Sequence, residues 1–395
     1  MEAIRRAALT RVESRGLPRA EDEEWRFTPV REITGKVFAP AAESVVRESD
    51  LGSLLLAPLD AYRLVFSNGR WLPSFSSKTP SDMQIGSIKA GVSDALLLGP
   101  DETGFAALSA AKFEDGPYIR VPKGAKLDKP IHIVYVGTAG ETAQEAHYRG
   151  AVVLEEGASA VVIEECVGRG GGTFFTNTVT RFELGENAEL ETSILLREPD
   201  SFLGVRDFRA RLRRDARLKA HAVALGGALQ RCDANVTLDG EGADAELNGL
   251  YLASGTQHFD FHTTVKHALP HGTSRELYKG VLDGKARAVF NGMVEVAPNA
   301  QKTDAQVYNR NLLLSEDGLI NTKPEFKIHA NDVQCKHGAT IGQLREEALF
   351  YLRSRGIGAA QARSLLVHAF AGEMLGRMSV EPVREALGAK IQELK

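Results

Sequence analysis

Apolar positions along this chain follow two different periodicities. From Tyr118 onward, for about two hundred residues, they alternate with polar positions in short runs such as AVVLEEGASAVVIEECV, which Gly, Asp and Asn interrupt. A period of two places successive side chains on opposite faces of a β-strand. Towards both ends of the chain the apolar residues instead recur three or four positions apart, which is helical spacing. We therefore expect a mainly β protein with helices near its two ends.

The first 105 residues predict a small mixed α/β domain. Apolar residues recur every fourth position over residues 4–16, which favours an amphipathic helix. The runs AYRLVF and RWLPSF flank Asn68-Gly69, and an Asn-Gly pair between two such runs is a strong β-hairpin signal. A helical piece over residues 105–113 closes this domain, which spans residues 1–105.

A short phrase recurs within the β region. It begins with a residue that tolerates left-handed backbone, continues with a small residue, and leads into a new strand. The phrase occurs as Gly124-Ala125-Lys126-Leu127, Gly157-Ala158-Ser159-Ala160, Asn187-Ala188-Glu189-Leu190, Asp215-Ala216-Arg217-Leu218 and Gly242-Ala243-Asp244-Ala245. Its first alanines are separated by 33, 30, 28 and 27 residues. A repeat of roughly 20–50 residues is typical of stacked-coil architecture, so we predict a parallel β-helix over residues 106–338.

A sandwich of β-hairpins is the alternative fold for this region. The pairs Asp239-Gly240 and Asp283-Gly284 suit hairpin turns as well as β-helix corners. A sandwich needs no repeated corner, so the repeats favour the β-helix.

Residues 339–395 predict a C-terminal helical domain of three short helices. Thr340 and Gln343 have the spacing of a capping box that would start the first helix. The second helix covers the run AAQARSLLVHAFAGEML. Its predicted inward residues are Leu365, Leu366, Ala369 and Phe370.

Composition narrows the classes of protein and partner. The 395 residues carry a net charge of −4, which gives no electrostatic reason to expect nucleic acid or an anionic membrane. Three cysteines are too few and too scattered for a disulfide framework. The first residues lack the apolar core of a signal peptide, and no apolar run is long enough to cross a bilayer. These features predict a cytoplasmic protein that does not bind a membrane.

Cys335 and His337 are the two most chemically capable side chains that stand close together in the sequence. Positions i and i+2 share one face of a strand, so the thiol and the imidazole should point the same way. Both groups bind iron and zinc. The alternation around them predicts a core face with Phe326 and Ile328, and a polar face that carries His329 together with Cys335 and His337.

Two ligands do not close a metal site, since structural sites usually have four. On spacing alone, the favoured interpretation is that Cys335 is a small buried hydrophobe and His337 a polar strand end. A structural zinc site made of His329, Cys335 and His337 is one alternative function. Another is a carbohydrate-active β-helix enzyme, although the acidic residues of this chain are scattered and the aromatic content is only 7%.

A second histidine-rich segment contains His258, His262, His267 and His271. The first two have one strand parity and the last two have the other, so in a single strand the pairs would face opposite ways. We interpret them as structural histidines. The chain also has no G-x-x-x-x-G-K-[ST] phosphate loop and no G-x-G-x-x-G fingerprint, so we expect no ATP site of its own.

Two long phrases resemble the SufB/SufD family of iron–sulfur cluster assembly scaffold proteins. They cover residues 278–318 and 332–357, and the N-terminal DEEWRFTP and the Asn68-Gly69 hairpin resemble the same family. The SufB-type chains carry a Cys-Gly-Ala-His phrase where this chain has INTKP at residues 320–324. They also carry Glu-His-Glu where this chain has CKHG. At both places this chain differs from the SufB type and resembles the SufD branch of the family.

The resemblance implies a right-handed parallel β-helix core with a C-terminal helical domain. It implies a non-catalytic scaffold that pairs with a SufB-type chain through the β-helix ends and docks the SufC-type ABC ATPase through residues 339–395. The implied ATPase contacts are Leu344, Leu349, Tyr351, Arg353, Arg355 and Phe370.

The resemblance also implies the substrate, a nascent iron–sulfur cluster or iron held transiently and shared with the SufB-type chain. His337 and Cys335 are the implied assembly residues, and His329 is the weaker candidate. The family complex is linked to reduced flavin, but this sequence contains no recognisable flavin motif. When the partner chain is absent, both a monomer and a homodimer paired through the same β-helix end are compatible with the sequence, since exposed sheet edges favour pairing.

Overall fold

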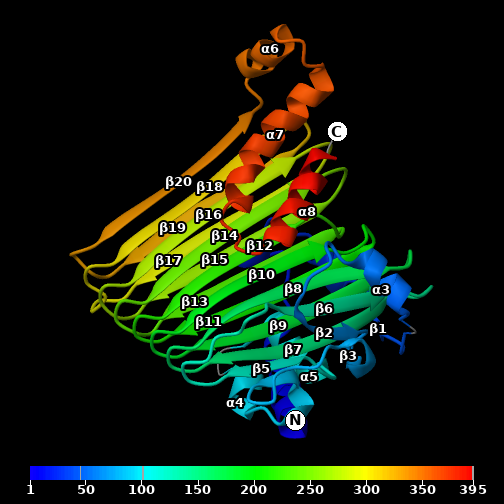
Figure 1. Ribbon diagram of the computed structural model, residues 1–395, viewed down its shortest axis with the longest axis vertical. Coiled ribbons are helices and arrows are strands. Elements are labelled where there is room, and N and C mark those ends of the chain that lie inside the picture. The colour runs from blue at the N-terminus through cyan, green and yellow to red at the C-terminus, as the bar shows by residue number, and fades with distance from the viewer. Residues whose placement is uncertain (45, 100–101, 394–395) are drawn as a thin grey trace.

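The computed structural model describes residues 1–44, 46–99 and 102–393. Within these ranges the chain forms two ten-stranded β-sheets, with short helices near the N-terminal end and three helices near the C-terminal end (Figure 1). The first sheet contains, in order, β19 (Leu319–Ile328), β17 (Arg287–Val296), β15 (His258–His267), β13 (Leu229–Leu238), β11 (Phe202–Leu212), β9 (Phe174–Leu184), β7 (Gln144–Leu154), β5 (Pro117–Val121) and β4 (Gln84–Ser87), with β1 (Ala39–Pro40) beside β7. The second sheet contains β20 (Gln334–Gln343), β18 (Asp304–Leu313), β16 (Thr273–Leu282), β14 (Asp244–Ala253), β12 (Arg217–Ala224), β10 (Glu189–Arg197), β8 (Ser159–Arg169), β6 (Ile131–Thr138), β2 (Tyr62–Ser67) and β3 (Arg70–Trp71).

Each strand of the main body pairs in parallel with the strand two places along the chain. Strand β9, for example, lies between β7 and β11, while β10 lies between β8 and β12. The chain therefore alternates between the sheets, and successive turns stack on one another. Antiparallel pairs within the described ranges are confined to β2–β3 and β4–β5. The predicted parallel β-helix is confirmed, and the alternative of a hairpin sandwich is wrong because its neighbouring strands would be antiparallel.

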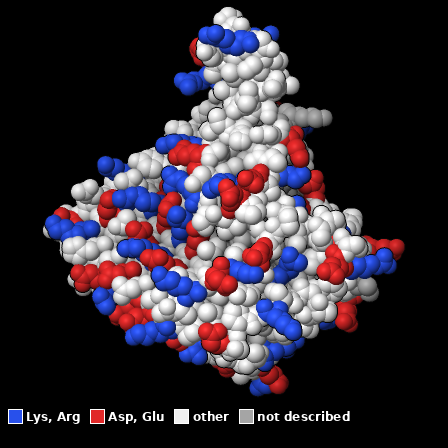
Figure 2. Space-filling view, in the orientation of Figure 1, with Lys and Arg blue, Asp and Glu red and all other residues white. Residues whose placement is uncertain are grey.

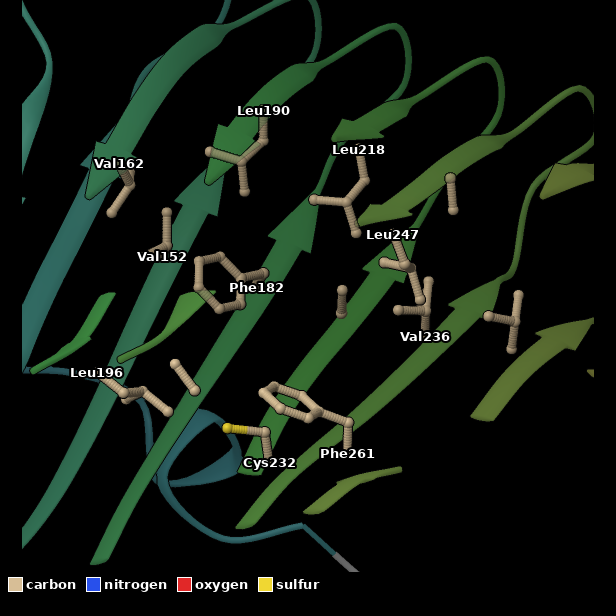
Figure 3. Close-up of a cluster of buried hydrophobic side chains, with 14 of the residues drawn as sticks. Val152, Val162, Phe182, Leu190, Leu196, Leu218, Cys232, Val236, Leu247 and Phe261 are labelled. Carbon is tan, nitrogen blue, oxygen red and sulfur yellow. The ribbon is translucent and has the colours of Figure 1, made fainter. Parts of the chain in front are cut away.

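Inward-facing side chains from the two sheets form one continuous apolar core. Leu190 lies opposite Leu218, and Leu218 lies opposite Ala245, so equivalent positions of successive turns stack in rows. Figure 3 shows Phe182 and Phe261 of the first sheet within the same layer. Burying a leucine or phenylalanine side chain contributes roughly 1.5–3 kcal/mol. Each turn gains this energy only when the next turn covers it.

The repeated corner phrase marks the points where the chain turns between sheets. The backbone is left-handed at all five predicted corners, with φ of 69° at Gly124, 67° at Gly157, 57° at Asn187, 54° at Asp215 and 70° at Gly242. Two further corners place a residue other than Gly, Asn or Asp in left-handed backbone, at His271 (φ 60°) and Lys302 (φ 62°). The phrase did not reveal these two, because neither position carries the Gly, Asn or Asp that usually accepts this conformation.

The N-terminal region contributes helices and strands to one end of the β-helix. The helices are α1 (Glu2–Arg15), η1 (Glu23–Trp25), α2 (Arg31–Thr34), α3 (Glu48–Leu54), η2 (Pro73–Phe75), η3 (Ile88–Ala90), α4 (Asp94–Leu97) and α5 (Gly104–Lys112). The predicted first helix, the Asn68-Gly69 hairpin and the helix near Phe105 are therefore confirmed. The hairpin strand β2 pairs with β6, so this region is continuous with the second sheet.

Three helices follow the last strand: α6 (Glu346–Ser354), α7 (Ala359–Leu375) and α8 (Glu381–Gln392). Figure 1 shows α7 and α8 lying over the second sheet, while α6 projects beyond it. The predicted capping box is wrong, because Thr340 and Gln343 both lie in strand β20. The division of the chain at residues 105 and 338 stays a prediction.

The inward face of α7 differs from the one predicted. The helix buries Ala362, Val367, Ala371, Met374 and Leu375. Leu365 and Ala369 are exposed, and Phe370 is half-buried against the sheet. Nearly every position of this segment is apolar or small, so the sequence alone did not distinguish one face from the other. Within the described ranges, no helix is long and apolar enough to cross a membrane.

Candidate functional site

The last turn of the β-helix leaves both sheets with an unpaired edge. Strand β19 pairs only with β17, and β20 pairs only with β18, among the strands described. Three large apolar residues on these two strands are exposed, Leu319 by 43%, Ile328 by 40% and Ile341 by 51%. An exposed strand edge with apolar side chains is a template for pairing with another chain. We call this end of the molecule, formed by β19 and β20, the open end.

Cys335 and His337 lie on the inner face of β20 at the open end. Cys335 is opposite Ala305 and His337 is opposite Val307, and both of these neighbours are fully buried in the core. The imidazole of His337 contacts the ring of Phe326 on β19, with 5.0 Å between ring centroids. The Cys335 thiol therefore continues the inward row of side chains that contains Ala305, and the His337 imidazole continues the row that contains Val307. No further turn of the described chain covers either group.

The structure confirms one part of the predicted arrangement and corrects another. Cys335 and His337 share a strand face, as their spacing predicts. They do not share a polar face with His329, because β19 ends at Ile328 and β20 begins at Gln334 in the opposite sheet. The turn between them resets the alternation, so Cys335 packs against the core instead of facing solvent.

The environment of Cys335 changes the pKa of its thiol and so the fraction that is thiolate. Partial burial raises the pKa of the Cys335 thiol, and a backbone hydrogen bond with Ala305 acts in the opposite direction without cancelling the effect. The thiolate is the form that binds metal. In the isolated chain the sulfur is therefore held as a thiol at neutral pH.

His329 lies apart from the other two candidates. It follows β19, is exposed, and its backbone N–H donates to the carbonyl of Val296 at 2.9 Å. In the ranges that the structure covers, no three His, Cys, Asp or Glu side chains form a group that could hold a metal ion. The proposed zinc site of His329, Cys335 and His337 therefore has no geometric support.

The histidine-rich segment lies in and after strand β15. His267 points into the core, where its Nε2 is 2.9 Å from the hydroxyl of Ser274. His262 has the opposite strand parity and lies on the outer face, within 3.0 Å of Asp260 and 3.1 Å of Glu24. His271 lies beyond the strand, at a corner. These positions agree with structural roles.

His262 belongs to an ionic cluster that the sequence did not reveal. The N-terminal segment around Glu24 crosses the outer face of the first sheet, where Arg231 lies 4.0 Å above the ring of Trp25 and 2.8 Å from Asp260. The two carboxylates raise the pKa of His262 to about 9 despite burial, and the Arg231 and His262 charges lower the pKa of Asp260. Glu24 and His262 are more than two hundred positions apart in the sequence, and no local pattern connects the two.

The predicted ATPase contacts fall into two groups. Leu349, Tyr351, Arg353 and Arg355 lie on or directly after α6, at the projecting end of the molecule, and Leu344 is half-buried just before it. Phe370 lies instead on α7, beneath the ammonium group of Lys279 at 4.6 Å.

Sequence reasoning missed Phe350, which is the most exposed aromatic residue of this region at 74%, beside Tyr351 at 57%. Its place beside Tyr351 in the run ALFYL of α6 was the available signal. Figure 2 shows basic and acidic side chains interspersed over the visible face, without a field of one sign. This distribution gives no reason to expect nucleic acid there.

The fold and the open end define a class of protein, a parallel β-helix whose final turn is left uncapped by the residues that the structure describes. Residues 135–370 match the family described as "SUF system FeS cluster assembly, SufBD core domain". The chain is 33% identical to "Iron-sulfur cluster assembly protein SufD" of Escherichia coli (strain K12), over 95% of this chain and 89% of that protein. It is also 33% identical to a SufBD family protein of Synechocystis, over 97% and 88% of the two chains, and 29% identical to "Protein ABCI7, chloroplastic" of Arabidopsis thaliana, over 98% and 84%. This chain belongs to the SufBD family of iron–sulfur cluster assembly proteins.

Proposed function

We propose that this chain is the SufD-type scaffold subunit of a cytoplasmic complex that assembles iron–sulfur clusters. In this complex it pairs with a SufB-type chain and docks a SufC-type ABC ATPase, and it catalyses no reaction itself. The observation that carries the proposal is the open end, where two strands with one unpaired edge each and exposed apolar side chains lie around Cys335 and His337. A related β-helix with an open end of the same kind would offer edge strands that also lack neighbours.

Cys335 and His337 would form half of an assembly site for iron and sulfide. Thiolate and neutral imidazole both suit iron, but two ligands leave most of its coordination positions free. The partner chain would supply the others across the joint. Because burial keeps the Cys335 sulfur protonated in the isolated chain, iron must arrive as the thiol loses its proton. This half-site therefore acts only when the partner and the metal are both present.

The ATPase would bind at α6. Phe350 and Tyr351 are exposed aromatic side chains on a helix that projects from the body, which is the composition of an interface anchor. The α7–α8 pair is less suited to this role, because its apolar face already covers the second sheet.

Anaerobic co-purification of the tagged full-length chain from its native host tests the proposal. Recovery of a SufB-like chain and an ABC-type ATPase is the expected result. Recovery of the chain alone, or as a homodimer through the open end, would contradict the complex. In parallel, His337→Ala should lower the activity of cluster-dependent enzymes in cells at least about tenfold, as loss of an assembly ligand does, while the complex still forms. His329→Ala is the matched control, and full enzyme activity in the His337→Ala strain would refute the assigned role.

A further inference from the structure

A small cavity lies inside the β-helix, between the two sheets and away from the open end. Its volume is about 60 Å³, and its lining includes Glu164, Thr180, Arg206, Cys232 and Phe261. Figure 3 shows Cys232 and Phe261 of this lining pointing inward from neighbouring strands of the first sheet. The other lining residues are divided between apolar side chains such as Ile194 and Leu247 and polar ones that include Asp207, His221 and Asp233.

Two of the lining residues are long, charged side chains that are almost completely buried. Glu164 is 4% exposed and Arg206 is 3% exposed. Arg206 donates from Nη2 to Glu198 at 2.8 Å and from Nη1 to the carbonyl of Thr176 at 3.0 Å. One Glu164 carboxyl oxygen, Oε2, accepts a long hydrogen bond of 3.4 Å from the Thr180 hydroxyl.

Each of these two side chains keeps one buried polar atom without a protein partner. The atoms are Oε1 of Glu164, an acceptor, and Nε of Arg206, a donor. Leaving a buried polar group unpaired costs roughly 1–3 kcal/mol, and more for a charged group. One donor and one acceptor on the wall of the same cavity are complementary to a molecule that can both accept and donate.

We propose that this cavity is a built hydration site, in which ordered water accepts a hydrogen bond from Arg206 Nε and donates one to Glu164 Oε1. The volume is sufficient, because a water molecule needs only about 10–15 Å³ of such space. The Thr180 hydroxyl offers a further polar contact on the same wall. The site connects Glu164 to the Arg206–Glu198 ion pair and joins three buried charged groups into one network. This inference does not depend on the proposed function.

The hydration site has a direct consequence for Glu164. Burial raises the pKa of its carboxyl group to about 7, so the group is partly protonated at neutral pH. A carboxylic acid and a carboxylate both hydrogen-bond to water, whereas only the acid form is tolerated in a dry cavity. Water in the cavity therefore lets Glu164 change its charge without unfolding the core.

Crystallography of the full chain, with and without xenon pressure, tests the inference. Wild-type crystals should show ordered density within hydrogen-bond distance of both Glu164 Oε1 and Arg206 Nε, and xenon should not enter, since xenon fills cavities that are apolar and dry. An empty cavity, or xenon bound in the wild-type protein, would overturn the proposal.

Variants separate the carboxyl group from the cavity shape. Glu164→Gln keeps an acceptor and should retain the water, while Glu164→Leu removes it and should admit xenon or close the cavity. Glu276→Leu is the matched control, because Glu276 is another fully buried carboxyl group of the second sheet that does not line this cavity. If Glu164→Leu fails to fold, the wild-type xenon result alone decides the question. Water retained in Glu164→Leu at the same position would also contradict the proposed acceptor.

Discussion

Gly249 lies on the inner face of β14, directly opposite Tyr278 of β16. A Cβ atom at this position would lie 1.9 Å from Cδ1 of the Tyr278 ring. That ring is buried and packs against Phe290 at 4.8 Å, so it has little freedom to move aside. The stacking of one turn on the next therefore requires glycine at position 249, because it has no side chain.

We predict that Gly249→Ala destabilises the protein by about 1–3 kcal/mol, the usual cost of overpacking a core. The midpoint of urea unfolding, compared with the wild-type midpoint, measures the effect. Gly171→Ala is the matched control, because a Cβ there meets nothing within 4 Å. Equal midpoints for the two variants would show that the Tyr278 ring moves away at no cost.

The His262 cluster makes stability depend on pH. Asp260 and Glu24 raise the pKa of this imidazole from its ordinary value of 6.5 to about 9, while Arg231 and burial act against them. A raised pKa means that the folded state holds the proton more tightly than the unfolded state does. The contribution is fully present below about pH 6.5 and is lost as the pH rises through about 9.

We predict that the wild-type chain loses up to about 3 kcal/mol of stability between pH 6.5 and 9.5 from this group. His262→Gln should remove that part of the pH dependence, as measured by urea unfolding at several pH values. His271→Gln should leave the pH profile unchanged, because His271 is an exposed corner residue. An unchanged profile in His262→Gln would contradict the cluster's role.

At the scale of elements, the C-terminal helices differ in how firmly they are held. The ammonium group of Lys279 donates to the carbonyl of Phe370 at 2.8 Å and pairs with Glu373 at 2.6 Å, which fastens α7 to β16. Helix α8 adds Leu387 and Ile391 to the same apolar cluster. Helix α6 has no buried residue and follows directly from β20. A partner that binds α6 is therefore connected to the strand that carries Cys335 and His337.

We predict that the double substitution Phe350→Ala and Tyr351→Ala weakens binding of the ATPase subunit by about 30-fold or more, because aromatic anchors dominate interfaces. Titration of the purified chain with the ATPase subunit measures the affinity. These substitutions are better than deletion of residues 339–395, since deletion would remove part of β20 and uncover the second sheet. Phe27→Ala, at another exposed aromatic residue, is the control, and unchanged affinity in the double variant would place the ATPase elsewhere.

The N-terminal segment secures one edge strand of the open end and not the other. Glu23 pairs with Lys323 on the outer face of β19 at 3.0 Å, and Glu24 contacts β15 and β17 through His262 and Asn291. The N-terminal segment as described shows no matching ion pair to β20. Strand β20 is therefore the less restrained of the two, which agrees with a role in joining another chain.

At the scale of the whole molecule, the two ends of the β-helix are different. The end nearest the N-terminus carries the antiparallel strands β3 and β4, together with helices α4 and α5 (Figure 1). The open end has no such cover among the described residues, and a stack of turns without a polar cap exposes its core. Because of this asymmetry, further β-helix turns from another chain can be added only at the open end.

We predict that Leu319→Lys combined with Ile341→Lys prevents both binding of the SufB-type chain and self-pairing of the isolated protein. Each change places a charge in an interface whose core must be dry, at a cost of several kcal/mol. Light scattering of the isolated chain and co-purification with the partner chain measure the two outcomes. Leu9→Lys on α1 is the matched control, and pairing that survives in the double variant would place the joint on another surface.

The sequence alone determined the architecture because the relevant signals are local and repeated. Alternating runs identified the strands, and residues such as Gly157, Asn187 and Asp215 identified the corners, since left-handed backbone admits few residue types. The spacing of Cys335 and His337 was sufficient to place both side chains on one face of a strand. Each of these inferences needs only a few neighbouring residues, repeated often enough to be recognised.

Only the tertiary structure decided which face of the strand Cys335 and His337 occupy. The turn after Ile328 moves the chain to the other sheet and directs Cys335 and His337 towards the core, away from His329. The ionic cluster of Glu24 and His262, and the cavity shared by Glu164 and Arg206, join residues from different turns or from distant parts of the chain. Such contacts leave no local pattern, because their energy depends on where the stacked turns bring distant side chains together.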